Sequence, residues 1–235
     1  MALIKYGGGI IAMSGSIAGN TFARNRYGYY ARARTKPTNP NSPGQQEVRA
    51  AIAWLVEHWS QTLTPAQRAA WNLYAKSVNM LNRLGEGMNL TGFNHFCRSN
   101  SIVKRNGDTV VVDGPTIFEI PEHDTTFAFI ATAGTQKISV TFDADAAWAN
   151  ETEGHMYIFV GKPMNAQRNF FAGPWKFAAA IDGDDTTPPT SPSEIDSPWV
   201  ISEGQALWSY ARIARADGRI SEPFRAGPTL VVSGV

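Results

Sequence analysis

The residues with the clearest chemical potential lie close together near the start of the chain. Four arginines fall between positions 24 and 34, with aromatic side chains among them. Guanidinium groups bind carboxylates or phosphates, and tyrosine rings stack on bases or bury amphipathic area at protein contacts. We therefore take this stretch as the candidate contact surface. Its residues are Phe22, Arg24, Arg26, Tyr27, Tyr29, Tyr30, Arg32 and Arg34.

Two kinds of partner suit this arginine and tyrosine stretch. A protein partner would supply carboxylates to the arginines and buried area to the tyrosines, and both residue types are enriched at protein–protein hot spots. A nucleic acid would supply phosphates and bases. We favour a protein partner, because the second half of the chain is acidic and would resist lying along DNA, and because the chain has no lysine-rich tail.

Catalytic and metal-binding patterns are not found in the sequence. The four histidines are far apart, and none is followed three or four residues later by a potential ligand. No GxSxG, HExxH or CxxC motif occurs, and the glycines at 7–9 are not followed by Gly-Lys-Ser/Thr. Residues 182–185 lack the remainder of a calcium-binding loop. We expect no enzymatic activity, no metal and no cofactor.

The elements that must position the arginines form a glycine-rich arm. Residues 7–46 contain seven glycines and no Asp or Glu. Short β-like runs cover residues 10–13 and 21–34, and an unbroken strand over 21–34 would place all four arginines on one face. Because so little aliphatic bulk is present, the arm cannot build a core alone and needs another chain to lie against. Three prolines then predict a stiff connector, so that arm and connector span residues 1–44.

Residues 45–107 have the periodicity of a three-helix unit. Apolar residues recur at helical spacing over 45–60 and 64–77, and a third helix is expected over 91–104, with a loop at 79–87. Thr64, Pro65 and Gln67 match an N-cap, a first-turn proline and a capping box. The expected aromatic core consists of Trp54, Trp59, Trp71, Tyr74, Phe93 and Phe96.

Residues 115–235 change to a pattern of strands and turns. About seven strands in about 120 residues are typical of a β-sandwich, and the stretch 182–198 is expected to be a solvated loop. The predicted fold class is therefore α+β. The expected strands cover residues 116–120, 127–131, 137–142, 155–160, 175–181, 199–201, 206–214 and 229–232.

Charge is distributed unevenly along the chain. Residues 1–106 carry thirteen Lys and Arg against three acids, a net charge of +10, whereas residues 107–235 have a net charge of −9. This division indicates either two separately solvated modules or head-to-tail association between copies. The single cysteine, Cys97, excludes an internal disulfide, and no apolar run reaches the length of a membrane span. With no signal-peptide pattern at the N-terminus, we expect synthesis in a cytoplasm.

The segment from Trp208 to Pro223 resembles the penultimate strand of fibronectin type III or immunoglobulin-like domains. A tyrosine, Tyr210, is followed by alternating apolar residues, a glycine turn and a Ser-Glu-Pro exit. The resemblance implies a sandwich over residues 115–235 in which Tyr210 is a core or corner residue. The tryptophan usual in the second strand is absent, and Phe142 stands in roughly its place.

The first half of the chain is similar to the N-terminal part of uncharacterised proteins of tailed bacteriophages and prophages. The similar motifs, which cover nearly half the chain, lie at 14–22, 32–49 and 63–71. This resemblance implies a structural protein of the virion, made in the cytoplasm of a bacterial host, and carries over no catalytic residue.

These observations predict a non-enzymatic virion component, an assembly, decoration or connector protein that docks on capsid or neck and tail subunits through its N-terminal arm. The expected partners are other virion structural proteins and copies of this chain, and no membrane. Nucleic acid is an alternative partner. A host-surface glycan is another, because Trp148, Trp175 and Trp199 lie near predicted strand ends, although edge packing accounts for them equally simply.

Overall fold

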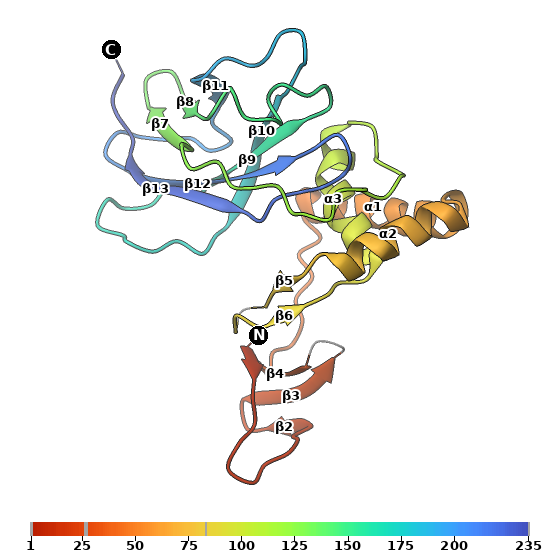
Figure 1. Ribbon diagram of the computed structural model, residues 1–235. Helices are drawn as coiled ribbons and strands as arrows, with labels where there is room; N and C mark the ends of the chain where they lie inside the picture. Colours follow the sequence, from red (N-terminus) through yellow and green to blue (C-terminus); the bar gives the residue numbers. More distant parts are fainter. Residues whose placement is uncertain (1, 26–27, 83, 235) are drawn as a thin grey trace.

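The computed structural model describes residues 2–25, 28–82 and 84–234. Within these residues the fold is mixed, with three α-helices and four antiparallel sheets. Figure 1 shows three parts in chain order: an N-terminal sheet, a helical unit, and a region of two facing sheets. The chain is therefore assembled from regions of different character.

The N-terminal sheet has four short strands in the order β1-β4-β3-β2. The β3–β4 hairpin forms its centre, with Asn25 opposite Gly28, and β1 and β2 are the edges. No described residue between positions 2 and 44 is fully buried. This agrees with the expectation that the arm has too little aliphatic bulk for a core. The strands are β1 (Ala2–Ile4), β2 (Gly15–Ile17), β3 (Asn20–Asn25) and β4 (Gly28–Ala33).

The hairpin overturns the expected single arginine face. Arg24 lies opposite Tyr29, whereas Arg32 lies opposite Thr21. Residues paired directly across two antiparallel strands point to the same face, so Arg24 and Arg32 project from opposite faces of the sheet. The prediction of one unbroken strand over 21–34 was wrong, because the chain reverses between β3 and β4. Residues of the same parity share a face only along one continuous strand, so the rule does not hold across the reversal. Residues 10–13, expected to be β-like, have no strand.

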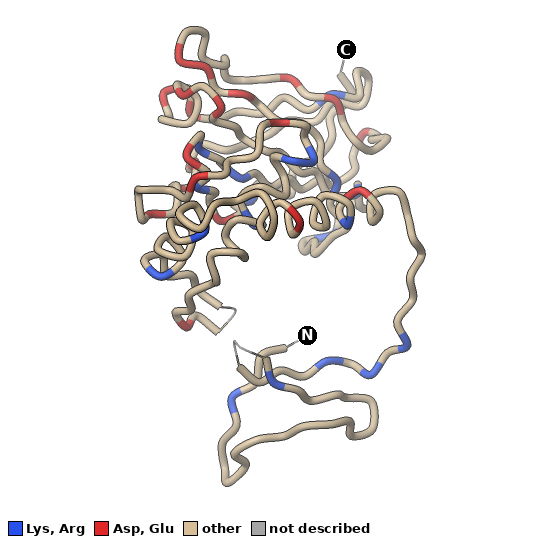
Figure 2. The backbone as a smooth tube through the Cα atoms, turned by 90° about the vertical axis from the view of Figure 1, so that its right-hand side faces the viewer, with Lys and Arg blue, Asp and Glu red and all other residues tan. Residues whose placement is uncertain are grey.

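The connector at residues 34–42 has no regular secondary structure and is exposed throughout, as its prolines predict. Its end is fastened to the first helix, since the Arg49 guanidinium donates to the side-chain oxygens of Asn39 (2.8 Å) and Asn41 (3.3 Å). Figure 2 shows the connector running as a single extended strand of chain between the N-terminal sheet and the helices.

Three helices follow, close to the expected ranges. They are α1 (Pro43–Glu57), continued by a π-helical turn (His58–Thr62), α2 (Pro65–Ser77) and α3 (Gly92–Asn106). Thr64 and Gln67 form the predicted capping box at α2, and Thr91 caps α3. Gly107 ends α3 in the left-handed conformation, at a φ of 94°, which glycine adopts without steric cost.

The helical core is smaller than the aromatic pattern predicts. Trp71, Tyr74 and Phe96 are fully buried, together with Leu55, whereas Trp54, Trp59 and Phe93 are only partly buried. Three apolar residues of the stripe on α1 stay exposed by about two fifths. These are Val48, Ile52 and Val56.

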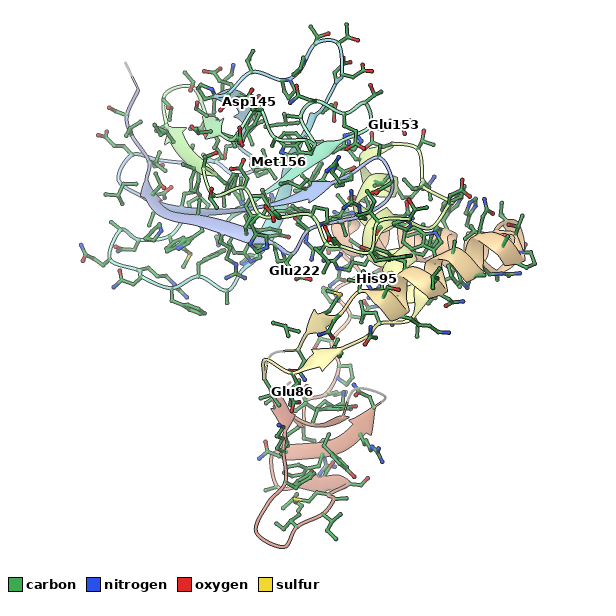
Figure 3. All side chains as sticks on the ribbon, in the orientation of Figure 1. Glu86, His95, Asp145, Glu153, Met156 and Glu222 are labelled. Carbon is green, nitrogen blue, oxygen red and sulfur yellow. The ribbon has the colours of Figure 1, made fainter. Side chains whose placement is uncertain are left out.

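A short hairpin replaces the loop expected at residues 79–87. It consists of β5 (Met80–Leu81) and β6 (Gly87–Met88) and extends from the helical unit toward the N-terminal sheet. Glu86, beside its tip, forms an ion pair with Lys5 of the N-terminal sheet (Figure 3).

The two-sheet region contains seven strands. One sheet has the order β11-β8-β7 and the other β10-β9-β12-β13. A single core cluster takes side chains from both sheets, including Ile138, Val140, Ile158 and Leu207, so the sheets bury their facing sides against each other. The strands are β7 (Ala128–Thr132), β8 (Lys137–Thr141), β9 (His155–Gly161), β10 (Trp175–Asp182), β11 (Ser193–Asp196), β12 (Ala206–Ala214) and β13 (Phe224–Leu230).

Several strand predictions in this region were wrong. Residues 116–120 and 199–201 form no strand, and the last strand begins at Phe224 rather than near Thr229. The expected loop 182–198 contains β11, which pairs with β8 through Ile195 opposite Ile138. Prolines lie on either side of this four-residue strand and two of its own residues, Glu194 and Asp196, are acids, so its pairing on β8 overrides their local preference.

The outer face of the larger sheet packs on the helical unit. Ile102 and Val103 of α3 contact Tyr157 and Phe159 of β9 in one buried cluster. Tyr210, expected in the core or at a corner, lies half-buried on this outer face and stacks on Phe159 at 4.6 Å. Both faces of the sheet are therefore covered, which explains why β9 is buried along almost its whole length.

A partly buried arginine joins the helices to the sheets. The Arg98 guanidinium donates to the carbonyl oxygens of Ile220 (2.7 Å) and Ser221 (3.0 Å) and forms an ion pair with Glu222 at 2.9 Å. The helical unit alone is of marginal size for an independent fold. Its contact with the two-sheet region adds buried area that the sequence did not predict.

Candidate interaction surface on the N-terminal sheet

One face of the N-terminal sheet combines aromatic and cationic side chains. Phe22 and Arg24 of β3 share it with Tyr29 of β4. The Arg24 guanidinium lies 5.3 Å from the centre of the Tyr29 ring, a cation–π distance, and Tyr6 meets the same ring edge-on at 5.0 Å. Arg24 stays exposed, so its charge remains available to a partner.

The opposite face carries the remaining members of the hairpin. Tyr30 lies opposite Leu3 of β1, and Arg32 lies opposite Thr21. Arg34 follows β4, where its backbone N–H donates to the carbonyl oxygen of Gly19 at 2.8 Å. Both arginine side chains are exposed. The structure thus distributes the predicted contact residues over two faces of the sheet and the end of β4.

Two of the predicted contact residues, Arg26 and Tyr27, lie outside the described part of the chain. The other six are brought together on the hairpin or directly after it.

The charged residues of the N-terminal sheet and connector are all cations. Residues 1–46 contain six Lys and Arg and no acid. Lys5 is paired with Glu86, whose pKa is lowered mainly by the hydrogen bond from Lys5 and then by one from Asn82. Within the described residues no carboxylate forms an ion pair with Arg24, Arg32 or Arg34. A partner with carboxylates or phosphates would therefore meet free guanidinium groups.

The N-terminal sheet and its loops also carry exposed aliphatic side chains, which the sequence analysis did not include among the contact residues. Ile11 is 88% exposed, Ile17 of the edge strand β2 is 61% exposed, and Ile10 is 51% exposed. The signal was present as an apolar pair inside a glycine-rich leader. Large apolar residues exposed beside free backbone edges mark sites where another chain adds.

A second group of titratable residues lies where the helical unit meets the sheets. His155 Nδ1 is 2.8 Å from the Asp182 carboxylate, and Tyr157 donates to Asp108 at 3.1 Å. Burial is the main cause that raises the pKa of Tyr157, and the charge of Asp108 adds to it. Tyr157 therefore stays a neutral donor. We infer that this group joins the helical unit to the two-sheet region, and these two parts together are called the body. In the described chain, no cluster of three or more His, Cys, Asp or Glu is arranged to hold a metal ion.

The three tryptophans considered for glycan binding do not present open rings on one surface. Trp148 is buried in the core between the sheets. Trp199 is half-buried and donates to the Val160 carbonyl oxygen at 3.0 Å, and Trp175 packs edge-on against Phe171 and Tyr210. Each ring therefore has a packing role.

No helix in the described residues is long and apolar enough to cross a membrane. Comparison of the chain with protein families, with curated proteins and with solved structures gave no match.

Proposed function

We propose that this protein is a non-enzymatic structural component of a bacteriophage virion that docks on capsid or neck and tail subunits through its N-terminal sheet. One observation carries the proposal. Residues 2–44 form an ordered sheet and connector in which no described residue is buried and no acid occurs. A two-sided sheet without a core is marginally stable in water, and it gains a core when a partner covers it.

The resemblance of the first half of the chain to proteins of tailed bacteriophages supports the virion setting. The resembling motifs include residues 14–22 and 32–49, which in this structure form much of the N-terminal sheet, the connector and the start of α1. The proposed contact residues therefore lie within the part of the chain that carries the resemblance.

The strand order supports an immunoglobulin-like or fibronectin type III-like region as the displayed module. The second and fifth strands of the two-sheet region, β8 and β11, are neighbours in one sheet, and the third and sixth, β9 and β12, are neighbours in the other. Sandwiches of this class share that adjacency. The region departs from the class pattern on its outer face, which α3 covers.

Particle incorporation tests the proposal. A phage lacking its own copy would be supplied with the full chain, with the chain lacking residues 2–42, or with Arg24→Ala, Arg32→Ala and Arg34→Ala combined. We expect both altered chains to fold, judged by circular dichroism, and to be lost from purified particles. A matched control replaces Lys76, Lys162 and Arg168, three cations outside the sheet. Normal incorporation of the deletion variant would overturn the proposal.

Nucleic-acid binding is a second candidate, favoured by exposed arginines among tyrosines with no acid nearby. It predicts that the purified chain binds DNA with an affinity that falls steeply with salt, the slope giving the number of phosphate contacts. Binding that is absent or insensitive to salt would remove this candidate.

A further inference from the structure

Two segments of the chain have the composition of strands but form no strand. Residues 10–13 lie in the N-terminal sheet region, and residues 116–120 lie between the helical unit and the two-sheet region. Both expose large apolar side chains. Ile10 and Ile11 are 51% and 88% exposed, and Ile117 and Phe118 are 47% and 42% exposed. Because these side chains remain open to water, the two segments do not cover each other within one copy.

The surroundings of the two segments are opposite in charge. The N-terminal sheet carries the free arginines Arg24, Arg32 and Arg34. The segment at 116–120 is continuous with a hollow lined by Glu119, Glu122, Asp124 and Asp143. Two arginines also line this hollow, but Arg215 is paired with Glu151 and Arg219 with Asp217. Among the described residues, the four carboxylates have no ion-pair partner, although Asp124 and Asp143 accept hydrogen bonds from nearby backbone N–H groups, so the hollow keeps an excess of negative charge.

We propose that residues 10–13 of one copy add as a strand to residues 116–120 of the next, which brings the positively charged N-terminal sheet of one copy against Glu119 and Glu122 of the other. This proposal rests on the proposed function and names a second copy of the chain as a partner of the N-terminal sheet. Contact between two N-terminal sheets is disfavoured, since residues 1–46 of each copy carry six cations and no acid. Figure 2 shows only basic residues among the charged residues drawn on the N-terminal sheet and connector, whereas the helices and the two-sheet region carry both signs.

The proposed contact joins different surfaces of two copies, so each copy keeps one free surface of each kind. Such heterologous contacts close into rings or continue as open filaments. The backbone groups of both segments, which lack strand partners in one copy, would then form ladder hydrogen bonds. Contact between large apolar side chains across the two strands would add to the attraction between opposite charges.

Charge reversal tests the electrostatic half of the proposal. Self-association would be followed by sedimentation at about 50 mM and 500 mM salt, and we expect it to weaken at the higher salt because exposed charges are screened. Reversing the sheet (Arg24→Glu, Arg32→Glu, Arg34→Glu) or the hollow (Glu119→Lys, Glu122→Lys) should each leave monomers. Mixing the two reversed variants should restore association between unlike copies. A control reverses Asp185, Asp196 and Glu203, exposed acids elsewhere on the two-sheet region, and should associate normally.

Disulfide trapping tests the geometry. In a background with Cys97→Ala, a copy carrying Ile11→Cys is mixed with a copy carrying Phe118→Cys, and we expect a covalent dimer within minutes of mild oxidation. The control pairs Ile11→Cys with Val200→Cys, which is 86% exposed on the two-sheet region. Equal yields from the two mixtures would overturn the proposal. So would a double Ile11→Cys, Phe118→Cys chain that closes within one copy at high dilution.

These measurements separate the proposal from the proposed function. A full chain that stays monomeric at all salt concentrations, while deletion of residues 2–42 still prevents incorporation into particles, overturns pairing between copies and leaves docking on a different subunit. Salt-dependent DNA binding without self-association assigns the arginines to nucleic acid and also overturns the pairing.

Discussion

The N-terminal sheet and the two-sheet region are both antiparallel β-structure, but they place their side chains in opposite environments. In the two-sheet region one core cluster contains nineteen buried residues, and strand β9 is covered on both faces. In residues 2–44 no described residue is buried. Backbone pairing alone therefore does not decide whether a sheet stabilises itself, because the favourable term comes mainly from the apolar area removed from water.

The same comparison extends to charge. The N-terminal sheet has cations without carboxylate partners, whereas many charges of the body are paired, as Arg215 is with Glu151 and Arg219 with Asp217. Charged side chains at an interface are complementary to those of the partner. Arginines without a carboxylate partner in the same chain therefore suit a docking surface. We use four changes to break or sharpen this contrast, ordered from the largest expected effect to the smallest.

Truncating one residue in each region should give the largest contrast. Leu207 is fully buried between the two sheets, so Leu207→Ala should lower the free energy of unfolding by about 3 kcal/mol through lost burial and the cavity left behind. Ile17→Ala, at an exposed position of the N-terminal sheet, should change it by less than about 0.5 kcal/mol. Urea denaturation followed by tryptophan fluorescence measures both, and similar losses would show that the N-terminal sheet has a core after all.

Acid should destabilise the body because it contains a buried histidine. The N-terminal sheet contains no histidine. His95, labelled in Figure 3, is fully buried, and neither ring nitrogen has a hydrogen-bond partner in the described residues. Burial, followed by the charge of Arg98, lowers its pKa from 6.5 to about 4. The folded chain then binds the proton less readily than the unfolded chain, so stability is full above pH 6.5 and is lost as the pH falls toward 4.

We expect this loss to be about 2 kcal/mol, less than the roughly 3 kcal/mol that the full shift represents, because water entry screens part of the cost. Denaturation series at pH 7, 5.5 and 4 measure it. His95→Met should flatten the dependence, while His123→Gln, at an exposed position, should leave it unchanged. A flat profile in the unaltered chain would contradict the expected burial of His95.

Removing residues 2–42 should have a small effect on the stability of what remains. No described residue of this segment is buried. The free energy of unfolding should therefore fall by no more than about 1 kcal/mol, which appears as a small shift in the midpoint of thermal unfolding. Scanning calorimetry of the shortened chain beside the full chain gives the shift. A loss above about 2 kcal/mol would place the N-terminal sheet within the cooperative unit of the body.

The smallest expected effect concerns how the N-terminal sheet is held near the body. Glu86→Gln removes the carboxylate that pairs with Lys5, so the sheet should separate more often and the connector at residues 34–42 should be cleaved faster by a protease. The same release should occur in the unaltered chain as the pH falls through the lowered pKa of Glu86. Glu57→Gln, an exposed acid on α1, serves as the control, and equal cleavage of all three chains would show that the ion pair does not hold the sheet.

Local signals predicted the helical unit well. Thr64 and Gln67 at one end of α2, and Gly107 after α3, act within a single turn of helix, so they can be identified without knowing the rest of the fold. Alternation over residues 138–142 predicted β8, whose inward side chains Ile138 and Val140 are buried in the core between the sheets. Six of the eight predicted contact residues lie on the β3–β4 hairpin or directly after it, on both faces of the sheet, and the other two lie outside the described chain.

What failed depended on distant partners. Parity placed Arg24 and Arg32 on one face, and the hairpin separated them. The stripe on α1 predicted burial for Val48 and Ile52, but the neighbouring elements cover only part of it. Strand β11 forms from a four-residue run because β8 offers it a free edge.

The sequence by itself determined where the helices begin and end, where alternating strands lie, that the leader lacks a core, and that the two halves differ in charge. Those properties follow from neighbours within a few residues or from composition. Only the tertiary structure decided which face each arginine occupies, that α3 covers the outer face of the larger sheet through Ile102 and Val103, and that Ile11 and Phe118 stay open to water. These depend on pairing between segments far apart in the chain, and such pairing is selected by the total area buried rather than by any local preference.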